Sequence, residues 1–242
     1  MKHEIIGDNL QIVNIEIGTG EKVYAEIGSF VYKSENVKIE SKMKGGVTDA
    51  VKRALTQESI FVNEFTSKGN GIIGFGGNMP GKIKMFKLGK NQNIICERGA
   101  FLCGEDTIKI EMQFTKPVAG IMGGEGIILQ KLVGPGTVFI FAVGDIIEYD
   151  LKKGESLEVA AGHLVAFGEN VNYDVEYIGG IFTAIFGGQG LMLAKFTGPG
   201  KVILQSMNES KLKKQLSSGS GMHSGTKVNI ASSLLGGFFR RR

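Results

Sequence analysis

The sequence predicts an all-β fold built from three tandem copies of one β-sandwich-like unit. Two observations support this expectation. The 242 residues include 37 glycines, about twice the usual frequency, and these glycines separate short runs rich in Val, Ile and Phe. Within the runs, apolar and polar residues alternate, which is typical of half-buried strands. With a hydrophobic fraction of 42%, a chain of this length can bury a large β core.

The three copies are marked by strings that recur in the same order. The first string is Gly28-Ser-Phe-Val, which reappears as Gly99-Ala-Phe-Leu and as Gly162-His-Leu-Val. A second element follows in each copy, beginning at Glu58, Glu125 and Gln189. Repetition of this kind indicates tandem structural units.

We expect the copies to span about residues 21–88, 92–143 and 145–207, within a single β domain of residues 1–207. The connection between the two elements of a copy differs among the three. In the first copy, residues 46–57 have apolar side chains at helical spacing with charged side chains opposite, which predicts a short amphipathic helix. The corresponding connections of the other two copies are apolar and rich in glycine.

Apolar residues in those two connections are candidates for contact with another subunit or with a membrane surface. They are Ile121, Met122, Ile181, Phe182, Ile185 and Phe186. Alternatively, they fill a larger core. Residues 178–194 carry no charge, but five glycines interrupt them, so we do not expect a membrane-spanning helix.

Residues 208–242 form a basic, Ser/Gly-rich linker that ends in an apolar and cationic tail. This segment holds seven basic residues and one acidic residue, which leaves 21 basic and 23 acidic residues in the rest of the chain. A body with a net charge of −2 argues against a nucleic-acid partner. The tail contains Leu234, Leu235, Phe238, Phe239, Arg240, Arg241 and Arg242. It could anchor to anionic lipid, or it could pack on its own domain or on a neighbour.

The compartment that these features favour is the cytoplasm. The start of the chain is charged and mixed, unlike a signal peptide. Two cysteines, Cys96 and Cys103, are too few for a disulfide framework in a chain of this size. We expect both to act as small apolar residues in strands.

Two glycine-rich strings imitate nucleotide-binding motifs. Residues 69–74 match a dinucleotide fingerprint by letter, but the residues that follow cannot begin the helix that would bind the pyrophosphate. Residues 76–82 match the spacing of a P-loop, but Ile83 stands where a hydroxyl should bind Mg²⁺. We therefore expect no cofactor site.

Candidates for catalysis are weak. Glu58, Glu125 and Gln189 occupy equivalent positions and could converge for acid–base chemistry, although capping or pairing at strand starts is the favoured explanation. His163 lies in an ordered element, where we expect a hydrogen-bonded structural role. We assign no catalytic residue and no metal ligand, and an enzyme is the less favoured reading.

Taken together, the strings resemble the altered-inheritance-of-mitochondria family. They include Glu58-Ser-Ile-Phe-Val-Asn-Glu-Phe, Arg98-Gly-Ala-Phe-Leu, Leu132-Val-Gly-Pro-Gly and Phe196-Thr-Gly-Pro-Gly. The resemblance implies a double-stranded β-helix fold like that of the tryptophan RNA-binding attenuation protein, and a trimer. It carries no established catalytic residues, and RNA binding does not follow from a shared fold.

Two functions from different classes fit these observations. The first is a non-enzymatic homo-oligomeric scaffold, peripheral to a membrane. The second is a small-molecule-binding protein with ligand sites between β units, which would require a pocket lined by aromatic side chains and a few convergent polar groups.

Overall fold

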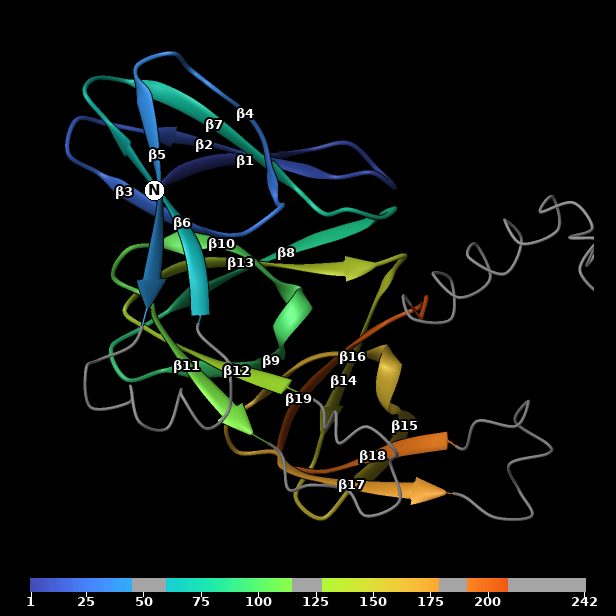
Figure 1. Ribbon diagram of the computed structural model, residues 1–242. Helices are drawn as coiled ribbons and strands as arrows, with labels where there is room; N and C mark the ends of the chain where they lie inside the picture. The colour runs from blue at the N-terminus through green and yellow to red at the C-terminus, as the bar shows by residue number, and fades with distance from the viewer. Residues whose placement is uncertain (45–59, 115–127, 179–190, 209–242) are drawn as a thin grey trace, which may run out of the picture. The chain divides into compact units, whose positions relative to one another are not determined.

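The computed structural model describes residues 1–44, 60–114, 128–178 and 191–208. Every strand lies in a unit that spans Met1–Met207 (Figure 1). All sheets are antiparallel, and the helical turns of the described residues are two short 3₁₀ turns, at Arg98–Ala100 and Ala161–His163. The prediction of an all-β fold is confirmed. The short helix expected within residues 46–57 lies outside the described residues.

The first set of six strands forms two groups of three. Its strands are β2 (Ile12–Ile17), β3 (Lys22–Glu26), β4 (Phe30–Lys33), β5 (Val37–Lys44), β6 (Ile60–Ser67) and β7 (Gly71–Gly76). One group has the order β2-β7-β4 and the other the order β5-β6-β3. An additional strand, β1 (Lys2–Ile6), covers the free edge of β2.

The second and third sets repeat this arrangement. The second comprises β8 (Gly81–Leu88), β9 (Asn93–Glu97), β10 (Phe101–Glu105), β11 (Lys109–Phe114), β12 (Ile128–Val133) and β13 (Gly136–Val143). The third comprises β14 (Ile146–Leu151), β15 (Ser156–Ala160), β16 (Leu164–Gly168), β17 (Asn172–Ile178), β18 (Leu191–Thr197) and β19 (Gly200–Gln205). Their groups are β8-β13-β10 with β11-β12-β9, and β14-β19-β16 with β17-β18-β15.

Adjacent sets are joined edge to edge into continuous six-stranded sheets. Strand β3 pairs with β10, which gives the order β5-β6-β3-β10-β13-β8. In the same way β9 pairs with β16, which gives the order β11-β12-β9-β16-β19-β14. We call these two pairings the internal junctions. They leave the group that contains β4 and the group that contains β15 at the two ends of the series (Figure 1).

Alternation along the strands builds the core. In β2, Val13, Ile15 and Ile17 are buried while the residues between them are partly or fully exposed. Aromatic rings complete the packing, as where Phe65 meets Phe75 edge to face with centroids 5.0 Å apart. The buried side chains form three clusters, and the central cluster contains residues from all three sets.

Each Gly-Pro-Gly string is a turn that leads from a strand of one group to a strand of the other group of the same set. One connects β12 to β13 and the other connects β18 to β19. The glycines that follow the prolines, Gly136 and Gly200, have φ values of 145° and 143°, a region that favours glycine.

Candidate functional site

The contact residues proposed from the sequence lie outside the described residues. This applies to Ile121, Met122, Ile181, Phe182, Ile185, Phe186, Leu234, Leu235, Phe238, Phe239, Arg240, Arg241 and Arg242. It also applies to Glu58, Glu125 and Gln189, whose convergence stays a hypothesis.

His163 has the hydrogen-bonded position that the sequence analysis predicts. Its Nδ1 lies 2.9 Å from the backbone oxygen of Gln205. The Gln205 side chain in turn donates to the carbonyl of Gly162 at 3.1 Å and accepts from the amide of Val143 at 2.9 Å. The ring therefore helps fix the end of β19 against the turn before β16.

The two cysteines are free and fully buried, which confirms their assignment as small apolar residues in strands. Each lies in an internal junction: Cys103 is opposite Ala25, and Cys96 is opposite Ala166. Burial raises the pKa of both thiols far above the ordinary range. Because the thiolate is the reactive form, neither residue has the properties of a nucleophile.

The glycine-rich strings are parts of strands and turns. Residues 71–76 form β7, and the next element along the chain is β8, which begins at Gly81. No helix begins where a dinucleotide or P-loop site would need one to receive a phosphate.

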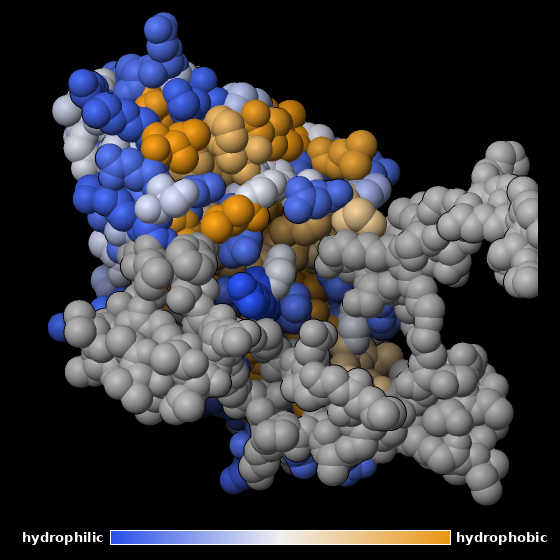
Figure 2. All heavy atoms as spheres, in the orientation of Figure 1, coloured by the Kyte–Doolittle hydropathy of each residue, from blue (hydrophilic) through white to orange (hydrophobic). Residues whose placement is uncertain are grey.

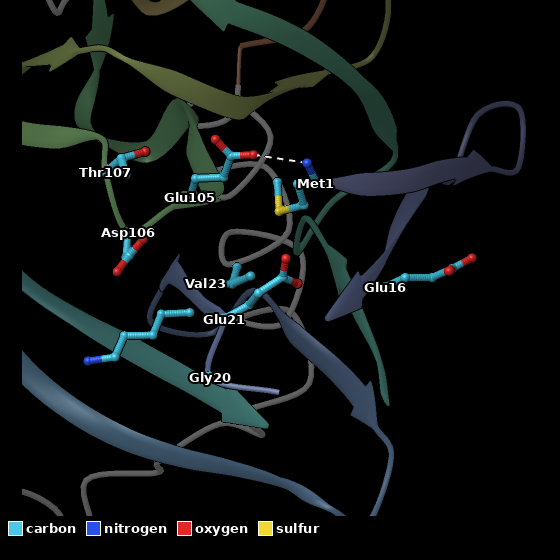
Figure 3. A pocket seen from close by; sticks show the side chains of 9 residues that line it. Met1, Glu16, Gly20, Glu21, Val23, Glu105, Asp106 and Thr107 are labelled. Carbon is cyan, nitrogen blue, oxygen red and sulfur yellow. Dashed lines mark ion pairs between the residues drawn. The ribbon is translucent and has the colours of Figure 1, made fainter. Parts of the chain in front are cut away.

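Two hollows adjoin the amino end of the chain. The smaller, of about 180 Å³, is shown in Figure 3, and its lining includes four acidic residues, Glu16, Glu21, Glu105 and Asp106. The amino group of Met1 lies 3.2 Å from Glu105 (Figure 3). The larger, of about 570 Å³, extends to Ser34 beside the end of β4. Neither hollow has an aromatic residue in its lining, which is a poor match to a typical small-molecule site.

Within the described part of the chain, no three His, Cys, Asp or Glu side chains are placed to hold a metal ion. No helix there has both the length and the hydropathy that a bilayer span requires.

The most unusual surface is strand β4. Phe30, Val31 and Tyr32 are 36%, 51% and 40% exposed, whereas apolar side chains of this size are usually buried in strands. Ile72, on the neighbouring β7, is also exposed. Figure 2 shows hydrophobic residues gathered over the part of the molecule where Figure 1 places β4 and β7. Exposed apolar side chains that gather on one face are typical of surfaces that bind another molecule.

The equivalent strands β10 and β16 occupy the same position but are covered. All three strands have an irregular register at their second residue: between Phe30 and Tyr32, between Phe101 and Cys103, and between Leu164 and Ala166. The first three residues of β10 and of β16 are each at most 2% exposed. The covering strand is β3 in one case and β9 in the other.

Strand β15 is the counterpart of β4 at the other end of the series. Its equivalents β3 and β9 each bond to two strands, whereas β15 pairs with β18 alone among the described strands. Along β15, Val159 is buried, but Leu157 is half-buried and Glu158 is exposed. The corresponding residues of β9, Ile94 and Ile95, are buried.

Charged groups near the first internal junction have shifted pKa values. Burial raises the pKa of Glu26, at the end of β3, to about 7; the Arg98 guanidinium opposes this shift and the Glu97 carboxylate adds to it. Burial also raises the pKa of Tyr24 to about 12, helped by its hydrogen bond to the buried Glu64. Burial is the largest cause of both shifts.

The recurring strings include the residues of β4, but nothing in the sequence alone marks β4 as an exposed surface. The string Gly28-Ser-Phe-Val is as apolar as its two equivalents, whose strands are buried, and this similarity was the available evidence that β4 needs a covering strand. What the string cannot show is which strand of a neighbouring set covers it.

Comparison with known proteins identifies the family. The sequence matches the family described as mitochondrial biogenesis AIM24 over residues 3–207. The chain belongs to this family. The match confirms the resemblance seen in the recurring strings.

Relatives of this AIM24-family chain include bacterial proteins of undetermined function. One is an uncharacterized protein of Streptococcus pyogenes serotype M6, 29% identical over 205 residues, with 81% of this chain and 82% of the relative covered. A crystal structure of a Streptococcus pyogenes protein is similar with a TM-score of 0.73 and 27% identity. That likeness covers 89% of this chain and 98% of the other.

Proposed function

We propose that this protein is a non-enzymatic scaffold that works as a homo-oligomer, with three chains as the expected number. The observation that supports the proposal best is the exposure of Phe30, Val31 and Tyr32 on β4, where the equivalent residues of the other two sets are buried. Burying such a surface against another molecule removes apolar area from water and so stabilises the association.

Membrane attachment is the second part of the proposal. The tail places Leu234, Leu235, Phe238 and Phe239 beside Arg240, Arg241 and Arg242. Apolar residues of this kind insert at the lipid interface and arginines attract anionic headgroups. One such tail binds weakly, but several tails on one oligomer would bind together with far greater strength. The place of action would then be the cytoplasm, at a membrane surface.

The oligomer is tested by measuring the mass of the full-length protein in solution by light scattering across a dilution series. We expect a multiple of 26.0 kDa, with the trimer as the favoured species. A monomer at every concentration would refute the scaffold proposal.

Membrane attachment is tested separately, by co-flotation with vesicles that contain anionic lipid. The full-length protein should float with them, whereas a variant that combines Arg240→Glu, Arg241→Glu and Arg242→Glu should not. Neutral vesicles are the control. Equal flotation of both proteins would contradict the role of the tail without affecting the oligomer.

A further inference from the structure

We propose that β4 of one chain pairs with β15 of a second copy, so that chains join head to tail through the same junction that joins their own strand sets. This inference rests on the proposed homo-oligomer and goes beyond it by naming the two strands, their register and a pair of charged residues at the contact.

First, the described sheets have two open edges of complementary type. Each set has one strand of the β3 type and one of the β4 type, and an internal junction always pairs a β3-type strand with the β4-type strand of the following set. Within the described chain, this rule is satisfied twice. It leaves one β4-type strand, β4, and one β3-type strand, β15, without that partner. The two free edges are therefore complementary to each other.

The second step is the register. At the first internal junction Cys103 is opposite Ala25 and Gly104 is opposite Tyr24; at the second, Ala166 is opposite Cys96 and Phe167 is opposite Ile95. The irregularity shared by β4, β10 and β16 fixes their alignment, with Tyr32 equivalent to Cys103 and Ala166. The strand order fixes that of β15, with Val159 equivalent to Ala25 and Cys96.

Carrying this register to the open edges places Tyr32 opposite Val159 of the second copy, and Lys33 opposite Glu158. A one-residue slip would move every side chain to the other face of the sheet, so the apolar residues that this contact would cover specify its register.

The third step is charge. Glu158 lies beside Lys195 on β18, and Lys195 lies beside Asp174 on β17. Adding Lys33 of the second copy would continue this row as acid, base, acid, base across four strands. Opposite charges at directly paired positions stabilise a sheet, whereas like charges destabilise it.

The fourth step is the surroundings of that pair. The equivalent residues at the second internal junction are Ile95 and Phe167, which are buried in the core of the third set. The Lys33–Glu158 pair would therefore be largely removed from water. A charge there depends on its partner, because an isolated charge in such a place is costly.

The fifth step is the fit of Tyr32. A Cβ atom on Gly74 would lie 2.7 Å from the Tyr32 ring, so the glycine makes room for that ring. In the other two sets the small residue is on the β4-type strand and the large residue is on its neighbour. Cys103 is paired with Phe139 and Ala166 with Ile203, and both large side chains are buried. The same space is filled in all three sets, but on β4 it stays partly open to solvent until a partner covers it.

A head-to-tail contact uses different surfaces on the two partners, so it closes into a ring or continues as a filament. Paired cysteines test it. In the full-length protein we would introduce Lys33→Cys and Glu158→Cys, singly and together, and oxidise each variant, so that cysteines on directly opposed strands join as a disulfide. The native cysteines are buried and should not react.

The double variant should form covalent multimers, and each single variant should remain a single chain on a non-reducing denaturing gel. Cross-linking of the Lys33→Cys protein to itself would indicate a symmetric β4–β4 contact and overturn the proposal. An oligomer in which the double variant does not cross-link would overturn the junction alone. A monomeric wild-type protein would overturn the proposed function as well.

Charge reversal gives an independent readout. Glu158→Lys alone should raise the apparent dissociation constant about tenfold or more, because it places two cations opposite each other. Combining Glu158→Lys with Lys33→Glu should recover part of this loss, because the contact regains opposite charges while the new lysine still faces Lys195 on β18. Failure of the combined variant to recover, while the single variants remain folded by circular dichroism, would contradict the register.

Discussion

Strand β4 and its equivalents β10 and β16 have the same place in the unit, the same irregularity and similar apolar residues, yet only β4 is exposed. The difference in exposure does not come from the strands themselves. A strand of the preceding set covers β10 and another covers β16, whereas β4 belongs to the first set and has no preceding set to cover it. The same apolar string is therefore buried in the core when its set lies inside the array, and exposed when its set lies at the end.

The largest difference between a covered and an exposed strand should appear when a carboxylate replaces the residue at the register irregularity of β10 and of β4. Leu102→Asp would bury an unpaired charge, and we expect the free energy of unfolding to fall by about 3–5 kcal/mol. Val31→Asp, on an exposed residue, should change it by about 0.5 kcal/mol or less when measured on dissociated chains. Urea unfolding of both variants at low protein concentration makes the measurement.

Light scattering then separates the two effects. Val31→Asp should lower the mass of the oligomer while leaving each chain folded. Equal losses of unfolding free energy in the two variants would mean that β4 is as deeply packed as β10.

A second contrast truncates the aromatic ring that begins two of these strands. Phe101→Ala should cost about 3–4 kcal/mol, because the ring is buried and its removal leaves a cavity. Phe30→Ala should cost about 1 kcal/mol, since its ring contacts Phe65 on one side and solvent on the other. Thermal unfolding of the two variants, side by side, measures the difference, and a larger loss for Phe30→Ala would contradict the open edge.

Much of the fold can be predicted from this sequence because the repeat makes each strand visible three times. Gly28, Gly99 and Gly162 align the sets, and the Gly-Pro-Gly strings mark two turns between consecutive strands. The pairing of β3 with β10 is different, because its partners are about 80 residues apart and alternation alone does not specify them. For that reason the exposed surface at Phe30 and Val31 escaped sequence reasoning. The contacts expected at Ile121 and Phe182 lie outside the described residues and stay predictions.

The charged groups of the first internal junction provide a smaller, pH-dependent contrast. The pKa of Glu26 is about 7 in the folded chain and its ordinary value is 4.5. Between these values the folded state binds more protons than the unfolded state, so the free energy of unfolding falls as the pH rises from about 4.5 to 7 and then levels off. Because the carboxyl keeps some contact with solvent, we expect a loss of about 1–2 kcal/mol.

Glu26→Gln isolates this contribution, since it keeps the shape of the side chain and removes its charge. The variant should match the wild type at pH 4.5 and exceed its unfolding free energy at pH 8. The equivalent position in β15 is Ala160, so the open edge has no corresponding carboxylate. A wild-type pH profile parallel to that of the variant would show that Glu26 is solvated as an ordinary carboxylate.

The smallest expected effect comes from making the open edge resemble an internal junction. Replacing Lys33 with Phe and Glu158 with Ile copies the pair formed by Phe167 and Ile95. Buried ion pairs and apolar pairs of similar volume often contribute comparably, so the double variant should associate within about fivefold of the wild type. Either single change should weaken association more, because it leaves one charge facing an apolar side chain. If the double variant is weaker than both single variants, the two residues do not face each other, and the equivalence between the open edges and the internal junctions fails at this pair.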